Sequence, residues 1–140
     1  MEQRHLIDIV HDQHPLVLPP GATVQEACRR MQKQKAGAVL IIEDKDRLVG
    51  IFTGRDAVGR VLAAGRDPIK TKLAEVMTPK PDCLPPGKTA IEALRQMADG
   101  NYRHLPVVEK GKLIGVISRG DFRAVEEARL DEETGLWQRI

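Results

Sequence analysis

The chain has 140 residues, of which 41% are hydrophobic and 30% are charged, with a formal net charge of +2. At roughly 100–200 residues per domain, this length allows one compact domain or two very small ones and excludes a multidomain enzyme. The composition excludes a disordered, collagen-like or membrane-spanning chain. Only 3% of the residues are aromatic. That leaves few rings for stacking on single-stranded nucleic acid, and the balanced charge is unlike that of a dedicated nucleic-acid-binding protein.

Cysteine usage and apolar runs set further limits. Cys28 and Cys83 have no second Cys or His at metal-ligand spacing, so the sequence predicts neither a metal site nor a disulfide framework, and we interpret both as small core residues. The longest apolar run, residues 36–42, is far shorter than the roughly 18 residues of a membrane span. No leader pattern is seen at the N-terminus. We therefore expect a cytoplasmic protein with no membrane partner.

An internal repeat is the most informative feature of the sequence. Leu-Pro-Pro-Gly occurs at 18–21 and again at 84–87, an offset of 66 residues. The match continues through Thr23 and Thr89 and, after a one-residue difference in a turn, through the strand that follows. The chain is therefore two copies of one unit of about 60 residues. Neither copy is expected to fold alone, because so small a unit buries too little surface.

Both copies predict the same first elements. A short leading strand comes first, and a helix is expected to begin at Thr23 and at Thr89, because Thr-x-x-Glu is a capping box and apolar residues follow at helical spacing. Two apolar segments of strand length, joined by a tight polar turn, then predict a β-hairpin in each copy. These segments are 38–42 with 48–52, and 105–108 with 113–117.

A second helix is expected to start at Thr53 in the first copy and at Ser118 in the second, where it would carry Phe122 and Val125. Each copy thus has the order strand, helix, strand, strand, helix, which is a mixed α/β (α+β) fold. The proline-containing segment between the copies is expected to be a connection. We assign residues 5–65 to the first repeat, 66–82 to the linker and the start of the second repeat, 74–126 to the second repeat, and 127–140 to a C-terminal tail.

These segments together resemble a tandem pair of cystathionine-β-synthase-type (CBS) domains, often called a Bateman module. The resemblance covers about residues 5–126 and rests on the repeat order, on Met77-Thr78-Pro79, on the strand 103–108 and on two Gly-x-x-[Thr/Ser]-x-x-Asp segments. It implies two repeats packed about a pseudo-twofold axis as one module. It also implies two clefts that bind adenine nucleotides or related adenosyl ligands such as NAD or S-adenosylmethionine, and further dimerisation of the module.

In each copy a hydroxyl residue ends a strand and a carboxylate follows three positions later: Thr53 with Asp56, and Ser118 with Asp121. A carboxylate accepts hydrogen bonds from vicinal hydroxyls such as those of ribose, and a helix start presents amides suited to phosphate. The resemblance implies these roles, with the Asp on the ribose and the hydroxyl residue near the phosphate. The same pattern is also an ordinary capping arrangement. Both roles can hold, because a capping Asp can exchange partners when a ribose arrives.

The two sites differ where the hairpin begins. The second copy has Arg103 and His104 where the first has Gly37 and Ala38. The resemblance implies that basic residues there face phosphates, and the alternative is a solvated strand end. We predict a second site made of Arg103, His104, Leu105, Pro106, Ser118, Arg119 and Asp121. The predicted first site consists of Gly37, Ala38, Thr53, Arg55 and Asp56, with Lys33 and Lys35 as further candidate cations.

The sequence contains no recognisable catalytic triad, metal cluster or Gly-rich phosphate loop, so it favours a non-enzymatic sensor that requires no cofactor. Its regulatory ligand would be AMP, ATP or a related adenosyl compound, and it would signal to an effector protein through the shape of a homodimer. The alternative is a dimerising scaffold with vestigial clefts. A nucleic-acid-binding regulator that uses the basic stretch 55–72 is a third reading, which the balanced charge elsewhere disfavours.

The C-terminal segment carries Trp137 within an acidic stretch. Because an exposed Trp is costly, we expect this tail to pack on its own module or on a dimer mate. The alternative is a partly ordered terminus.

Overall fold

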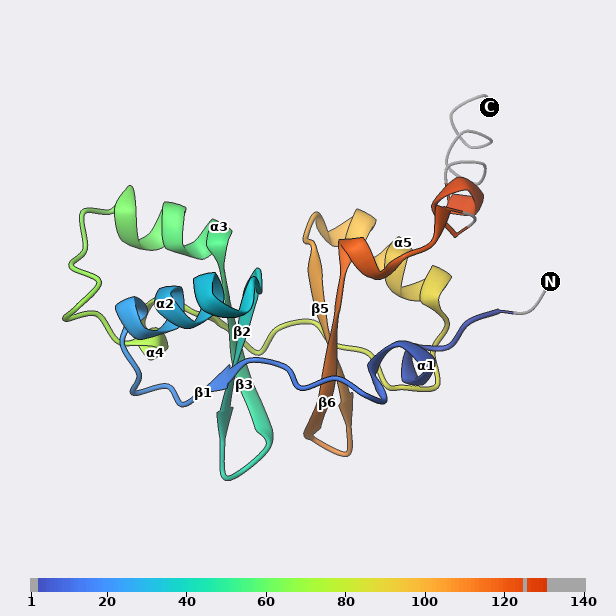
Figure 1. The fold of residues 1–140 in the computed structure, drawn as a ribbon, viewed down its shortest axis with the longest axis horizontal. Coiled ribbons are helices and arrows are strands. Elements are labelled where there is room, and N and C mark those ends of the chain that lie inside the picture. The colour runs from blue at the N-terminus through green and yellow to red at the C-terminus, as the bar shows by residue number, and fades with distance from the viewer. Residues whose placement is uncertain (1–2, 125, 131–140) are drawn as a thin grey trace. The chain divides into compact units, whose positions relative to one another are not determined.

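The computed structural model describes residues 3–124 and 126–130 (Figure 1). Contacts group the chain into two compact units, each of which contains one repeat. The first-repeat unit consists of His14–Pro81 with Lys110–Leu113, and the second-repeat unit consists of Met1–Gln13, Asp82–Glu109 and Ile114–Ile140. Each repeat contains both helices and strands, which confirms the mixed α/β fold predicted from the sequence. The predicted packing of the C-terminal tail falls on residues 131–140, outside the described residues.

The sheet of the first-repeat unit confirms the predicted leading strand and hairpin. The leading strand β1 (Val17–Leu18) runs parallel to β2 (Ala38–Glu43), and β2 is antiparallel to β3 (Arg47–Thr53). A further strand, β4 (Thr78–Pro79), pairs with β3 on its other side. Lys112 also pairs with β3, at Arg47.

The helices predicted for this unit begin at the expected capping residues. Thr23 caps α2 (Val24–Gln34), since its hydroxyl accepts a hydrogen bond from the Glu26 N–H at 3.2 Å. The helix ends at Lys35, which is in the left-handed conformation with φ of 53°. Thr53 begins α3 (Gly54–Asp56), which continues as the π-helical segment η1 (Ala57–Leu62). The apolar face of α2 packs against β2 and β3, and Phe52 is fully buried among aliphatic side chains.

The second-repeat unit repeats this order with small differences. Thr89 caps α5 (Ala90–Gly100), and β5 (His104–Glu109) pairs with β6 (Lys112–Ser118). The leading strand is reduced to a single parallel bridge between Leu84 and Val107. Side chains alternate along this segment, and the inward position belongs to Leu84. Cys83 is therefore exposed, and its predicted place in the core is wrong, whereas Cys28 packs against the core of the first-repeat unit.

The helix predicted to start at Ser118 is the clearest correction. Residues Arg119–Asp121 form only a turn of 3₁₀-helix, η2, and Phe122 then adopts an extended conformation with ψ of 144°. Helical structure resumes at residue 124 and continues over 126–130. Val125, which the prediction also placed on this helix, lies outside the described residues. The Asp121 carbonyl accepts a hydrogen bond from the Arg4 guanidinium at 2.8 Å, so a side chain takes the acceptor that a continuing α-helix would use.

A short helix that precedes each repeat in sequence packs on the other repeat. Helix α1 (Leu6–Val10) belongs to the second-repeat unit, where the Leu6 N–H donates to the Lys88 carbonyl at 2.9 Å; Figure 1 shows it in the same part of the fold as α5. Helix α4 (Leu73–Val76) belongs to the first-repeat unit, where the Leu73 N–H donates to the Ala22 carbonyl at 2.9 Å. Neither helix was predicted, because a helix of four or five residues has no readable period.

Each short helix lies against a glycine of the unit on which it packs. Helix α1 lies against Gly115 on β6, α4 lies against Gly50 on β3, and each of these strands ends at a candidate turn. A Cβ at Gly115 on β6 would lie 2.7 Å from the Val10 Cβ, and a Cβ at Gly50 on β3 would collide with the Met77 side chain. The absence of a side chain at Gly50 and Gly115 therefore allows α4 and α1 to approach these strands closely.

Candidate functional site

The turn after β3 brings the predicted residues of the first site together. Thr53 and Ala38 are cross-strand partners, and the Gly54 N–H donates to the Gly37 carbonyl at 3.3 Å. The Asp56 carboxylate accepts hydrogen bonds from the Thr53 N–H at 3.0 Å and the Thr53 hydroxyl at 3.2 Å. Asp56 is thus held one helical turn beyond the strand end, and its side chain is only 13% exposed.

The turn after β6 has the same geometry. The Asp121 carboxylate accepts from the Ser118 N–H at 2.7 Å and from the Ser118 hydroxyl at 3.2 Å. The Arg119 N–H donates to the Arg103 carbonyl at 3.0 Å, which matches the Gly54–Gly37 bond of the first repeat. Both Asp residues therefore do what the capping interpretation predicts. Each also remains a half-buried carboxylate beside the start of the other hairpin strand.

His104 gives the second turn an electrostatic character that the first turn lacks. Burial lowers the pKa of His104 below its ordinary value of 6.5, the Arg103 charge lowers it further, and Asp121 acts in the opposite direction. His104 is therefore neutral at pH 7, and the charges of both Arg103 and Asp121 act on its pKa. The equivalent position in the first repeat is Ala38, which is buried and carries no charge.

The other predicted site residues differ in their exposure to solvent. Leu105 is fully buried in the core, and Pro106 is buried with its carbonyl accepting from the Leu84 N–H at 3.1 Å. These two residues fix the position of β5, whereas Arg103 is exposed and Arg119 is half-buried. In the first repeat Arg55 is exposed, and so are Lys33 and Lys35 at the end of α2.

Arg60 contacts the first turn and was not among the predicted site residues. Its Nε lies 3.4 Å from Asp56 Oδ1, and its Nη1 donates to the Met77 carbonyl at 3.0 Å. Arg60 therefore ties Asp56 to the segment that covers Gly50. The i,i+4 spacing of Asp56 and Arg60 is a signal that the sequence does contain.

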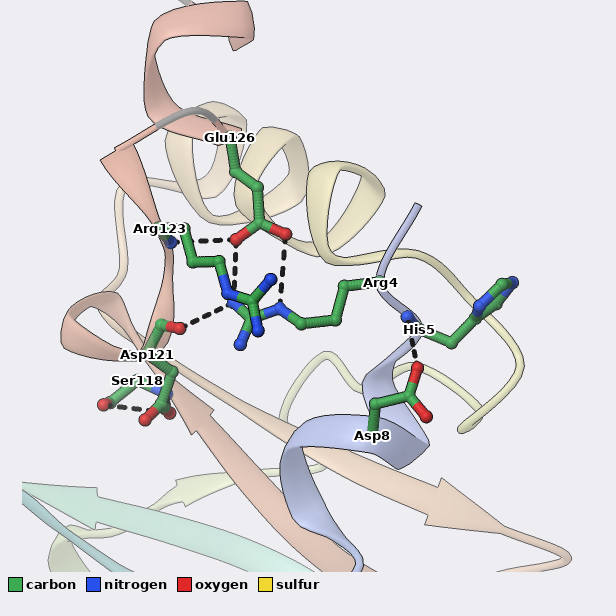
Figure 2. A network of polar contacts seen from close by, with 7 residues as sticks. All are labelled: Arg4, His5, Asp8, Ser118, Asp121, Arg123 and Glu126. Atoms are coloured by element: carbon green, nitrogen blue, oxygen red, sulfur yellow. Dashed lines mark hydrogen bonds and ion pairs between the residues drawn. The ribbon is translucent and has the colours of Figure 1, made fainter. Parts of the chain in front are cut away.

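Arg4 contacts the second turn, as Figure 2 shows, and was also missed. Its Nη2 donates to the Asp121 carbonyl at 2.8 Å and to the Glu126 carboxylate at 2.7 Å. Glu126 is 6% exposed and also accepts from the Arg123 N–H at 2.9 Å. Burial raises the pKa of Glu126, but the hydrogen bonds from Arg4 and the Arg123 backbone outweigh burial, and the net pKa lies below the ordinary value of 4.5. Arg4 and Glu126 are 122 positions apart, so no local pattern marks the pair.

Within the described part of the chain, no three His, Cys, Asp or Glu residues are grouped as metal ligands. The helices of residues 3–124 and 126–130 include none that is long and apolar enough to cross a membrane. The candidate site residues are those of the two strand-to-helix turns, with the cations beside them.

Comparison with known proteins identifies a family match in both repeats. The chain matches the CBS domain family over residues 6–63 and 73–127. It is 41% identical over 102 residues to the CBS domain-containing protein CBSCBSPB3 of Arabidopsis thaliana, in an alignment that covers 73% of this chain and 18% of the plant protein. The chain therefore spans less than a fifth of that relative's length.

Solved structures show the same fold. A CBS-domain-containing protein from Agrobacterium tumefaciens is 29% identical, with a TM-score of 0.77 over 89% of this chain and 98% of that chain. A CBS domain protein from Pyrobaculum aerophilum, whose structure is complexed with AMP, has a TM-score of 0.81 at 24% identity and covers 91% of this chain and 98% of that one. At that identity the second likeness establishes the fold alone.

Proposed function

Because this chain belongs to the CBS-domain family and carries a tandem pair of the domain, a Bateman module, we propose that it is a non-catalytic regulatory module that binds an adenine nucleotide. The candidate ligands are AMP, ATP and related adenosyl compounds such as NAD or S-adenosylmethionine. The observation that carries the proposal is the half-buried Asp at the strand-to-helix turn of both repeats. The AMP complex of the Pyrobaculum aerophilum relative supports the ligand class.

The capping geometry is compatible with ribose binding. Asp56 Oδ2 and Asp121 Oδ2 each accept from a backbone N–H and from a hydroxyl. The backbone bond is fixed by the turn, whereas the hydroxyl proton can rotate away. A ribose hydroxyl would then donate to the carboxylate in its place, and the freed Thr53 or Ser118 hydroxyl would donate to the ligand.

The cations beside the turns support binding of a phosphorylated ligand, most strongly in the second repeat. Arg103 and Arg119 lie at the two strand ends joined by the Arg119–Arg103 backbone bond, and His104 lies beside them. We assign phosphate contact to these side chains. In the first repeat we assign backbone contact with an adenine edge to Gly37 and Ala38, and the candidate cations are Arg55 and Arg60, which pairs with Asp56.

Calorimetric titration with AMP tests the proposal. Asp56→Ala should weaken the first site and Asp121→Ala the second, each by at least about tenfold, because a hydrogen bond to a charged group is lost. The double variant should bind AMP at least about tenfold more weakly at both sites. Glu92→Ala is the matched control, since Glu92 plays the same capping part at the start of α5 and belongs to neither turn. Absence of AMP, ATP, NAD and S-adenosylmethionine binding to the unsubstituted chain would refute the nucleotide proposal, as would AMP binding in the double variant that is as tight as in the unsubstituted chain.

A dimerising scaffold is the second candidate function. Val58 and Leu62 are 61% and 70% exposed, one turn apart on η1, and both Asp carboxylates already have capping partners in the absence of ligand.

We propose that the module forms a homodimer and that an effector protein responds to its shape. A ligand changes that shape only if it binds one arrangement more tightly than another.

A further inference from the structure

We propose that Arg4 is a positioning residue of the second nucleotide site. It holds the Ser118–Asp121 turn in its binding conformation through a hydrogen bond to the backbone carbonyl of Asp121. The inference rests on the proposed function for its ligand, but its geometric basis is independent of that function. Arg4 lies ahead of the first repeat in sequence, yet its guanidinium contacts the turn of the second (Figure 2). Its contact is with the Asp121 backbone, so the Asp121 carboxylate remains directed at Ser118.

The position of Arg4 is fixed from several sides. Its carbonyl accepts from the Ala90 N–H at 2.8 Å, which anchors its backbone at the start of α5. Its side chain is 18% exposed and forms an ion pair with Glu126, whose own side chain is 8% exposed. Glu126 is in turn held by the Arg123 N–H. Because so much of this pair is shielded from water, it fixes geometry more firmly than a surface ion pair would.

The second turn needs such support more than the first. In the first repeat, α3 runs directly into η1, and the helix itself continues the turn that bears Asp56. In the second repeat the helical turn stops at Asp121, and Phe122 is extended. The Asp121 carbonyl is bonded to Arg4, so the guanidinium replaces the missing next turn of helix.

The test uses a double variant that removes the charge pair without leaving a buried charge. Arg4→Met with Glu126→Gln loses the contact to Asp121, while the amide oxygen introduced at position 126 can still accept from the Arg123 N–H. The matched control is Arg66→Met with Glu75→Gln. That pair is also a short Arg–Glu contact, at 2.6 Å, and Glu75 likewise accepts from the N–H three residues earlier, at 2.8 Å. It includes no residue of either turn.

AMP affinity is measured for each site separately. In an Asp56→Ala background, the Arg4→Met, Glu126→Gln variant should bind AMP about tenfold more weakly, the scale of one lost charged hydrogen bond. In an Asp121→Ala background it should leave the first site unchanged. The Arg66→Met, Glu75→Gln control should leave the second site unchanged. Equal weakening of the second site by the two double variants would overturn the positioning role.

Hydrogen exchange in the ligand-free protein provides the readout that does not depend on AMP. The Ser118 and Arg119 amides should lose protection in the Arg4→Met, Glu126→Gln variant, while the Thr53 and Gly54 amides keep theirs. Unchanged exchange at Ser118 and Arg119 would overturn the inference whether or not AMP binds. If AMP binds no variant but these amides lose protection, the nucleotide proposal fails and the role of Arg4 in holding the turn stands.

Discussion

His104 is the residue of the second candidate site whose charge changes closest to neutral pH, and the first site has Ala38 in its place. Two charged residues of the proposed site affect its pKa: Arg103 lowers it and Asp121 raises it. The backbone of Arg103 is bonded to Arg119 in the turn that also contains Asp121. Because its pKa is lowered, the imidazole is neutral at pH 7 and becomes a cation only below pH 6.5. A bound phosphate favours the cationic form, and by linkage protonation of His104 must strengthen the binding of an anionic ligand.

We therefore predict that AMP affinity at the second site rises as the pH falls from 7 toward 5.5. The measurement is calorimetric titration in the Asp56→Ala background, where the first site is weakened and the second site is unsubstituted. His104→Ala should flatten the profile. The first site, measured in the Asp121→Ala background, carries Ala38 at this position and corrects for the titration of the AMP phosphate itself. A second-site profile identical to that of the first site would show that His104 does not face the phosphate.

At the scale of the element, the short helices α1 and α4 depend on glycines in the strands that they cover. A Cβ added at Gly115 would lie 2.7 Å from the Val10 Cβ and 2.8 Å from Gln13 Oε1. Gln13 accepts a hydrogen bond from the Val116 N–H at 3.0 Å, so its position is already fixed. Relief of this overlap requires α1 to move.

Gly115→Ala should therefore lower the free energy of unfolding by about 1–3 kcal/mol, the usual cost of overpacking a fixed contact. Urea denaturation measures the change. Gly87→Ala is the control, because a Cβ there would meet no atom within 4 Å. Equal stability of the two variants would mean that α1 is not held against β6 as described.

The parts of the fold that the sequence predicts are those decided by neighbouring residues. Thr23 and Thr89 cap their helices because the capping partner lies three positions away, and the β-hairpins follow from short apolar runs. The break after Asp121 was not predicted, because no local pattern marks it and the side chain that bonds the Asp121 carbonyl, Arg4, is distant in sequence. The contact between Glu126 and Arg4 was not predicted for the same reason, since the two residues are 122 positions apart. The capping bonds of both turns are formed as the pattern predicts, but the helix expected after Ser118 stops at Asp121, and the role of the turns in binding a nucleotide stays a prediction.

At the scale of the whole molecule, the exposed side chains of η1 bear on assembly. Val58 and Leu62 share one face of that segment, and a patch of this kind is costly to leave in water. Val58→Lys with Leu62→Lys should convert the proposed homodimer to a monomer, as measured by light scattering after size-exclusion chromatography. Ile69→Lys is the control, since Ile69 is 60% exposed outside η1. A dimer that survives the η1 substitutions would place the interface elsewhere.

The exchange of the short helices has a consequence for the integrity of the chain. The polypeptide passes from one unit to the other at residues 13–14, 81–82, 109–110 and 113–114. No single peptide bond can therefore be cut to give two fragments that each contain one whole unit. A protease that nicks the segment before α4 would leave each short helix covalently attached to one repeat and folded on the other. The repeats of the sequence and the compact units of the fold therefore do not coincide. A domain boundary placed between the two sequence repeats separates each short helix from the unit on which it packs.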